Sequence, residues 1–301
     1  MPILISGSMA FDVLMEFDGH FADHILSDQI DKLNVSFLTP RMRSDFGGCA
    51  ANVAYAVKQL GGEPIPVASI GQDGGNYLER LRQLGIATEH IAVLPDCYTA
   101  QCVIVTDRRQ NQFTAFHPGA MAEAHLNTMP LDTGATVAIV SPNGKQAMQE
   151  HAQQLHRAGI PFVFDPGQAI SQFAGDELHA LIDQATWLTL NEYEAFLLCE
   201  KTGLERAALA SRLRGLIVTL SGRGCEIWTG GETTVVEPFQ ASEVVDPTGC
   251  GDAWRGALMV GLERGWPLTR AARLGNYMGA RKIAHRGPQN YHIDPEDVAA
   301  F

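Results

Sequence analysis

The stretch that decides how this 301-residue sequence is interpreted is Asp246-Pro247-Thr248-Gly249-Cys250-Gly251-Asp252-Ala253-Trp254-Arg255-Gly256-Ala257. Proline fixes φ, and the two glycines of the turn permit backbone conformations that are closed to other residues. A helix of small residues follows at once, so the turn directs backbone N–H groups toward one point near a helix N-terminus. The helix dipole adds to the attraction for negative charge. We therefore expect the amides of Gly249, Cys250 and Gly251 to form an anion hole.

Asp252 lies at the edge of this expected anion hole. One interpretation is structural, because aspartate is common at helix N-caps. The other is catalytic: the carboxylate accepts a proton from a substrate hydroxyl while the amides hold the transferring phosphoryl group. The full spacing D-P-T-G-C-G-D favours the catalytic interpretation.

This spacing resembles the C-terminal signature of the ribokinase-like (PfkB) carbohydrate kinases, D-T-x-G-x-G-D, in the D-P-T variant of nucleoside-type members. The segment Gly47-Gly48-Cys49-Ala50-Ala51-Asn52-Val53-Ala54 is similar to the N-terminal signature of the same family. The resemblance implies that Gly48 lets the backbone approach a sugar and that Asn52 hydrogen-bonds its hydroxyls. Alone, the segment would be a glycine turn before a helix. Two signatures in the family's order favour the family interpretation.

Two weaker motifs concern the nucleotide. Asn191-Glu192-Tyr193-Glu194 resembles the family's N-x-x-E motif, which implies that Asn191 contacts ATP and that Glu194 organises Mg²⁺ through water. Alone, it would be a capped helix. Residues 219–224 resemble the family's T-x-G-x-x-G loop. The ATP contacts that the resemblance implies are Thr219, Ser221 in the place of a glycine, Gly222, Gly224 and, in a late helix, Asn276.

Within the family, the chain is most similar to bacterial adenosine kinases, which carry G-S-x-A-x-D, S-F-L and F-x-P-G-A-M. This chain has Gly7–Asp12, Ser36–Leu38 and Phe116–Met121. Asp12 would accept hydrogen bonds from vicinal hydroxyls, and Phe116 would stack on a purine. The substrate contacts implied are Ser8, Asp12, Ser36, Gly48, Asn52, Phe116 and, at the base or ribose edge, Gln168.

One position departs from the adenosine kinase pattern. Cys102 stands where those kinases place a second stacking aromatic residue. A ribokinase- or fructokinase-type sugar kinase would drop the purine and keep every other assignment. A non-catalytic nucleoside-binding protein would be expected to lack Asp252. A dinucleotide-dependent oxidoreductase needs G-x-G-x-x-G after the first strand, and Gly7-Ser8-Met9-Ala10 does not supply it.

The motifs together predict ATP-dependent phosphoryl transfer to the 5′-hydroxyl of a ribonucleoside, adenosine giving AMP, in purine salvage. Asp252 would act as the base, and ATP and Mg²⁺ would be required. In this family a monovalent cation often lies behind the anion hole. Here the resemblance implies K⁺ near Asp246, Thr248 and residues 284–287.

Repeated strand–helix units predict one three-layer α/β/α domain over residues 1–301 with a mostly parallel sheet. Segments at about residues 11–17, 32–38 and 98–118 lack crossover helices, so we expect them to form a small projecting β-sheet that closes as a lid. In the bacterial relatives such lids also pair between subunits, so the resemblance implies a homodimer through the lids, and alternating exposed apolar residues in the lid suit this pairing. These residues are Val35, Phe37, Val103 and Val105.

Composition excludes other classes of partner. A formal net charge of −12 argues against binding to nucleic acid or anionic membranes. No apolar run approaches the roughly 20 residues that span a bilayer, and the N-terminus lacks the features of a signal peptide. Six scattered cysteines without a C-x-x-C pair predict reduced thiols in a cytoplasmic protein.

Overall fold

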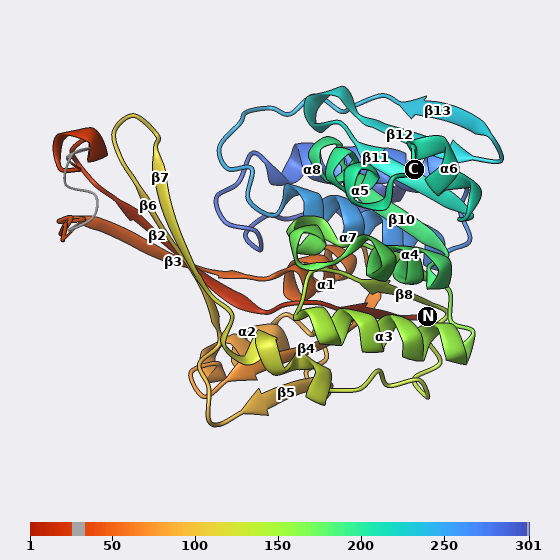
Figure 1. The fold of residues 1–301 in the computed structure, drawn as a ribbon, viewed down its shortest axis with the longest axis horizontal. Coiled ribbons are helices and arrows are strands. Elements are labelled where there is room, and N and C mark those ends of the chain that lie inside the picture. Colours follow the sequence, from red (N-terminus) through yellow and green to blue (C-terminus); the bar gives the residue numbers. More distant parts are fainter. Residues whose placement is uncertain (26–33, 300) are drawn as a thin grey trace.

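The computed structural model describes residues 1–25, 34–299 and 301. Within these residues, a nine-stranded sheet lies between two layers of helices, and a four-stranded sheet projects away from it (Figure 1). The predicted three-layer α/β/α architecture with a separate small sheet is confirmed. No helix in the described part of the chain has the length and apolar character needed to cross a membrane.

The large sheet has the strand order β13-β12-β11-β10-β9-β8-β1-β4-β5 and is parallel except at the β11–β12 and β12–β13 pairs. Its strands are β1 (Pro2–Ser6), β4 (Glu63–Gly71), β5 (Ile91–Leu94), β8 (Val137–Val140), β9 (Phe162–Phe164), β10 (Trp187–Asn191), β11 (Gly215–Thr219), β12 (Cys225–Thr229) and β13 (Glu232–Val236). β1 pairs with β4 on one side and β8 on the other, so the strand order reverses there. Such a reversal opens a crevice at the carboxyl ends of the strands.

Helices cover both faces of this sheet. One layer contains α1 (Cys49–Gln59), α2 (Gly75–Gln83), α7 (Cys250–Glu263) and α8 (Leu268–Lys282). The other contains α3 (Lys145–Ala158), α4 (Gly175–Gln184), α5 (Glu192–Thr202) and α6 (Arg206–Ser211). Alternation along β1 feeds both cores: Ile3 and Ile5 point into the first, and Leu4 points into the second. The short helix α9 (Pro295–Ala299) lies near the C-terminus.

Helices α1 and α7 approach closely because small residues meet between them. A Cβ atom at Gly256 would lie 2.4 Å from the Cβ of Ala56, so only glycine fits there. Both helices begin at the crevice, each after a glycine with positive φ, Gly48 and Gly249. Their first turns therefore face one another at the carboxyl edge of the sheet.

The projecting sheet has the order β3-β2-β6-β7. Its strands are β2 (Ala10–Glu16), β3 (Arg41–Gly47), β6 (Ala100–Thr106) and β7 (Gln112–His117). The strand predicted at 32–38 is wrong in its described part, because residues 34–40 are irregular and β3 begins only at Arg41. Residues 32 and 33 lie outside the described residues.

A cluster of aromatic rings explains the wrong strand. The ring of Phe37 lies 4.9 Å from that of Phe17 and 5.0 Å from that of Phe21, measured between centroids. Side-chain contacts at the tip of the small sheet therefore hold Phe37, where the sequence suggested an exposed strand position. The charged segment Arg41–Gly47 pairs with β2 instead, and Arg41 forms ion pairs with Glu16 and Asp18.

Candidate active site

A cleft of about 720 Å³ lies between the small sheet and the carboxyl edge of the large one. It brings together residues that are far apart in the sequence. The predicted site residues in its lining are Ser8, Asp12, Gly48, Asn52, Phe116, Gln168, Asn191, Glu194, Thr248, Gly249, Gly251 and Asp252. Among the described residues, its lining does not include Ser36, Thr219, Ser221, Gly222, Gly224, Asp246, Cys250 or Asn276.

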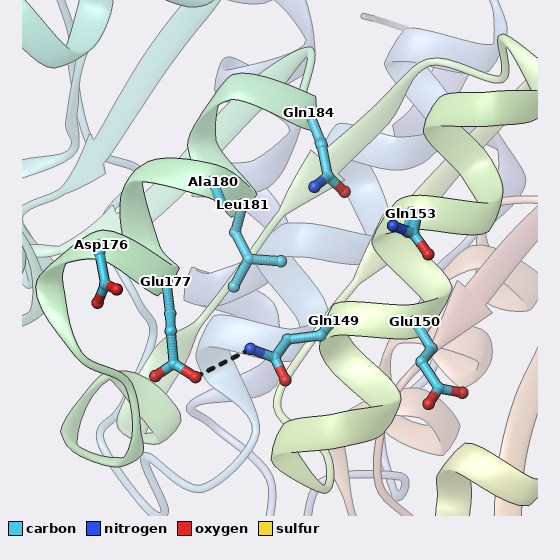
Figure 2. Close-up of a pocket in the computed structure, with 8 residues that line it drawn as sticks. All are labelled: Gln149, Glu150, Gln153, Asp176, Glu177, Ala180, Leu181 and Gln184. Carbon is cyan, nitrogen blue, oxygen red and sulfur yellow. Dashed lines mark hydrogen bonds between the residues drawn. The ribbon is translucent and has the colours of Figure 1, made fainter.

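A second, smaller hollow of about 330 Å³ lies between α3 and α4 (Figure 2). Its walls are mostly polar surface side chains. Gln149 Nε2 donates to Glu177 Oε1 at 3.1 Å, and Glu177 also accepts from Lys145. None of the predicted site residues lies in this hollow, as far as the chain is described. The larger cleft is therefore the candidate active site.

Asp252 is the third residue of α7, and the N-cap is Gly249, whose φ is 79°. The helix-capping interpretation of Asp252 is therefore excluded. Its Oδ2 accepts a hydrogen bond from Asn52 Nδ2 at 2.8 Å. Burial raises the pKa of Asp252, while the Asn52 amide and the nearby Arg255 charge oppose that rise. A carboxylate with a raised pKa that faces a cleft is suited to accept a proton.

A chain of side chains fixes the orientation of Asn52. Gln289 Nε2 donates to Asn52 Oδ1 at 2.9 Å and to the Tyr77 hydroxyl at 2.7 Å. The Tyr77 hydroxyl donates to the carbonyl oxygen of Gly47 at 2.6 Å. With Oδ1 engaged by Gln289, the Nδ2 of Asn52 faces Asp252. The side-chain hydrogen bonds of Asn52 in the structure are with Gln289 and Asp252, and its role in sugar binding stays a prediction.

The glycine turn presents fewer amides than predicted. Gly249 and Gly251 line the cleft. The N–H of Cys250 instead donates to the carbonyl oxygen of Pro247 at 3.1 Å, which closes the turn. Cys250 is therefore removed from the predicted anion hole. A Cβ atom at Gly249 would lie 2.4 Å from the Cβ of Pro288, so this turn requires glycine for contact as well as for φ.

Arg255 is a site residue that motif comparison did not single out. It lines the cleft, and its Nη2 donates to Asp165 Oδ1 at 2.7 Å and lies 3.7 Å from Glu194 Oε2. Burial acts to lower the pKa of Arg255, but the carboxylates of Asp165 and Glu194 outweigh it and raise the pKa. A Cβ atom at Gly251 would lie 2.8 Å from Arg255 Nη1. A permanent positive charge therefore lies beside the glycine amides.

Asn191 and Glu194 begin helix α5 and also line the cleft. Glu194 N–H donates to Asn191 Oδ1 at 2.8 Å, and Asn191 N–H donates to Glu194 Oε2 at 2.7 Å. This capping box starts α5. Both residues also line the cleft, so the cap fixes a carboxylate at its wall.

At both positions of the diglycine motif, a side chain would collide with neighbouring atoms. A Cβ atom at Gly47 would lie 2.3 Å from Asp12 Oδ2, and one at Gly48 would lie 2.6 Å from the carbonyl oxygen of Ser8. Ser8 Oγ accepts from the N–H of Cys49 at 3.1 Å. Burial and then the charges of Asp252 and other carboxylates raise the pKa of Asp12 to about 6. The diglycine thus leaves room for the Asp12 carboxylate in the cleft.

The far end of the cleft is formed by the small sheet and by loops of the large one. Phe116 pairs with Cys102 across β6 and β7, so both side chains lie on one face of that sheet. The Phe116 side chain is 51% exposed, and both residues line the cleft. Asn143 also lines it, and in the described part of the chain its Nδ2 has no hydrogen-bond partner. This buried donor follows β8, and sequence reasoning missed it.

The loop predicted to bind ATP follows β11, at the same edge of the sheet. Ser221 has φ 54°, the left-handed conformation that a glycine would adopt at no cost. Gly224 has φ 85°, and a Cβ atom there would lie 2.1 Å from the carbonyl oxygen of Val236. The backbone therefore keeps the glycine-type loop conformation although Ser221 replaces a glycine.

Two predicted contacts need correction. The Asn276 amide is committed to structure, since Oδ1 accepts from Trp254 Nε1 at 2.9 Å and Nδ2 donates to the carbonyl oxygens of Val236 and Glu237. A nucleotide could use it only by breaking these bonds. Ser36 lies exposed in the irregular segment before β3, away from the cleft as described, because the predicted strand that would have carried it is not formed.

Asp246 anchors the glycine turn. Its Oδ1 accepts from Thr248 N–H at 2.9 Å, and its Oδ2 accepts from Gly287 N–H at 3.0 Å and from Arg43. Burial acts to raise the pKa of Asp246, but the two N–H groups outweigh it and lower the pKa to about 2. Lys282 Nζ donates to the carbonyl oxygen of Asp246 at 2.7 Å. A K⁺ ion at the position expected beside Asp246 and Thr248 would lie close to this ammonium group.

The pfkB family carbohydrate kinase model matches residues 17–294 of the chain. The chain belongs to this family. The nucleoside kinase of Methanocaldococcus jannaschii is 26% identical over 275 residues, 90% of each chain, and the ribokinase of Bacillus subtilis is 26% identical over 296 residues, 95% of this chain and 94% of the relative. The solved structure of Burkholderia thailandensis nucleoside kinase in complex with inosine has a TM-score of 0.89 and 45% identity, and covers 99% of this chain and 96% of that one.

The predicted resemblance to ribokinase-like kinases is thereby confirmed. This pfkB kinase carries out ATP-dependent phosphorylation of an alcohol group on a nucleoside or a sugar.

The role of Asp252 as a proton acceptor can be tested by substitution. Asp252→Asn keeps the shape and can still accept the Asn52 hydrogen bond, but it cannot accept a proton. We expect kcat to fall by about 10²–10⁴, the usual contribution of a general base, with acceptor KM changed only a few-fold. Steady-state kinetics with ATP and Mg²⁺ measures this. Asp176→Asn, on the exposed start of α4, is the matched control and should keep wild-type kcat. Full turnover in Asp252→Asn would exclude it as the base.

Proposed function

We propose that this kinase transfers the γ-phosphoryl group of ATP to the 5′-hydroxyl of a purine ribonucleoside, with adenosine giving AMP as the first candidate. The observation that carries the proposal is the exposed ring of Phe116 in the same cleft as the Asp12 carboxylate. A ribose diol would bind the carboxylate, and a base would stack on the ring. The Burkholderia relative was solved with inosine, which makes a 6-oxopurine nucleoside the second candidate.

The proposed chemistry uses the chain's own groups in sequence. The carboxylate of Asp252 accepts the proton of O5′, and that oxygen attacks the γ-phosphorus in line. The bond from the γ-phosphorus to the β,γ-bridging oxygen breaks, and ADP leaves. The amides of Gly249 and Gly251 and the guanidinium of Arg255 stabilise negative charge on the transferring group. Positioning and electrostatics provide most of the acceleration, because the protein forms no covalent bond to the substrates in this phosphoryl transfer.

The nucleotide is proposed to lie along the carboxyl ends of β10 and β11, against Asn191 and the loop of Thr219, Ser221, Gly222 and Gly224. The same family's Burkholderia structure with ADP and inosine supports ATP as the donor. Within the described residues, no three acidic, His or Cys side chains are grouped to hold a metal ion. Mg²⁺ would therefore be held mainly by nucleotide phosphates and water, with the Glu194 carboxylate in reach of a bound water. It would neutralise charge on the phosphates.

A substrate panel tests the proposal. ADP release with ATP and Mg²⁺ is measured for adenosine, inosine, ribose and fructose, in the wild type and in Phe116→Ala. We expect a purine nucleoside to have the highest kcat/KM. Phe116→Ala should raise its KM by about 5- to 150-fold, the loss of about 1–3 kcal/mol of stacking, with KM for ribose unchanged.

Phe196→Ala is the matched control for this variant, because the Phe196 ring is 60% exposed on α5 and does not line the cleft. It should leave nucleoside KM within a few-fold of wild type. Preference for ribose or fructose, with no effect of Phe116→Ala, would favour the sugar-kinase alternative and keep Asp252 as the base. No ADP release with any acceptor would favour a non-catalytic nucleoside-binding protein.

The raised pKa of Asp12 gives a pH prediction. With a pKa of about 6, Asp12 is ionised at pH 7.5 and protonated at pH 5, where it loses part of its capacity to accept from the ribose diol. Nucleoside Kd, measured calorimetrically without ATP, should rise as pH falls below 6, by up to about tenfold per pH unit. Asp12→Asn should bind weakly at every pH. A wild-type Kd that is constant from pH 7.5 to 5 contradicts the assignment.

We also propose the homodimer through the small sheets. β3 and β7 are edge strands, and exposed apolar side chains lie on or beside them, including Met42 at 66% and Phe113 at 46% exposure. Pairing of such edges or burial of such side chains would stabilise a dimer. Light scattering at micromolar concentration should give twice the mass of one chain. A single-chain mass at that concentration contradicts the dimer.

A role in purine salvage and a cytoplasmic location complete the proposal. All six cysteines lie in described residues as free thiols, which supports a reducing compartment. Cell fractionation tests the location; recovery outside the cytoplasm would contradict it.

A further inference from the structure

Lys282 is a buried cation at the C-terminal end of α8. Its side chain is fully buried, with 0% exposure. The ammonium Nζ donates to the carbonyl oxygen of Asp246 at 2.7 Å and to that of His285 at 3.1 Å. Burying a charged ammonium is costly unless hydrogen bonds and opposite charge compensate it. The cost indicates that this charge has a local role.

The ammonium joins two turns that carry the active site. One turn begins at Asp246 and leads to the glycine amides; the other runs from Ile283 to Gly287. The N–H groups of Val245 and Asp246 both donate to the carbonyl oxygen of Ile283, at 2.9 and 3.0 Å. Gly287 N–H donates to Asp246 Oδ2 at 3.0 Å. Lys282 adds the bonds that hold the Asp246 and His285 carbonyls together beneath the glycine turn.

The charge of Lys282 also reaches the groups of the turn. Burial raises the pKa of Asp252, and the Lys282 charge is among the influences that oppose this rise. Burial raises the pKa of Cys250 to about 11, again against the Lys282 charge. The ammonium therefore favours the ionised form both of the Asp252 carboxyl and of the Cys250 thiol at the start of α7.

Potassium does not fit at this position. Such an ion needs oxygen ligands, and the carbonyl oxygens of Asp246 and His285 already accept from the ammonium. A second cation at the same oxygens would be repelled. The K⁺ expected from the family resemblance is thus replaced by a side chain of the protein.

We propose that Lys282 is a positioning residue that supplies a fixed cation beneath the anion hole, so that phosphoryl transfer by this kinase does not require K⁺. The proposal rests on the kinase activity of the family but not on the identity of the acceptor. Any acceptor that the enzyme turns over can therefore be used to test it.

The wild type provides the first test. Initial rates and melting temperature are measured in KCl, NaCl and tetramethylammonium chloride at equal ionic strength, with saturating ATP and Mg²⁺ in the rate assays. We expect kcat to agree within about twofold among the three salts and the melting temperature not to rise in KCl. An activation of several-fold by KCl over tetramethylammonium chloride would overturn the proposal without any variant.

Lys282→Met provides the second test, because it keeps an unbranched side chain that is one atom shorter and removes the charge. In tetramethylammonium chloride, kcat should fall at least about tenfold and by no more than the roughly 10²–10³ lost with a whole oxyanion-hole donor. Acceptor KM should stay within a few-fold. Adding KCl or NH₄Cl should restore part of kcat and raise the melting temperature, because the vacated carbonyl oxygens can then bind a free cation.

Lys58→Met, an exposed charge near the end of α1, is the matched control and should behave as wild type in all salts. Wild-type kcat in Lys282→Met would contradict the positioning role. A loss of kcat that neither K⁺ nor NH₄⁺ restores would also contradict it, since a purely structural lysine gives that result. If Lys282→Met does not fold, the salt comparison on the wild type decides alone.

Discussion

The hydrogen bond from the Asn52 amide to the Asp252 carboxylate connects the first turns of α1 and α7 across the cleft. The bond is possible only because the two helices approach closely at Gly256, where a side chain would collide with Ala56. It is also directional, because Gln289 occupies the oxygen of the Asn52 amide. The strand reversal at β1 then sets where this pair lies, at the carboxyl edge of the sheet.

An acidic protein that binds ATP must place positive charge locally. The chain has a formal net charge of −12, yet buried cations adjoin the glycine turn on two sides. Arg255 lies beside Gly251, held by Asp165, and Lys282 lies beneath Asp246. Neither cation is free to move into solvent, so the electrostatic field at the turn is set in advance of substrate binding. Such preorganised charge is more effective than charge that must be recruited during the reaction.

Much of this arrangement could be predicted from the sequence, for a physical reason. The parallel sheet follows from repeated strand–helix units, and the turn before α7 follows from local glycine and proline conformations. Most of the predicted cleft residues lie at strand ends or helix starts, such as Ser8 after β1 and Asn191 at the end of β10. Parallel strands bring their carboxyl ends to one edge, so order in the sequence is enough to place these residues.

The features that could not be predicted from the sequence depend on contacts between segments that are distant in the chain. Gln289 has no motif around it, and only the fold brings it to Asn52. Asn276 was expected to contact the nucleotide from a late helix, but its amide is bonded to Trp254 and to the end of β13. The apolar residues around Phe37 favoured a strand. In the structure, ring contacts at the tip of the small sheet hold Phe37 in an irregular segment. Tertiary contacts of this kind override local propensity.

We have proposed that a purine ribonucleoside presents its 5′-hydroxyl to Asp252 in this cleft. The most direct measurement is ³¹P NMR of the product formed from ATP and adenosine or inosine. We predict one equivalent of ADP and a phosphomonoester whose phosphorus couples to the two protons at C5′. A phosphomonoester at the 2′ or 3′ position, or inorganic phosphate without any nucleoside monophosphate, would contradict it.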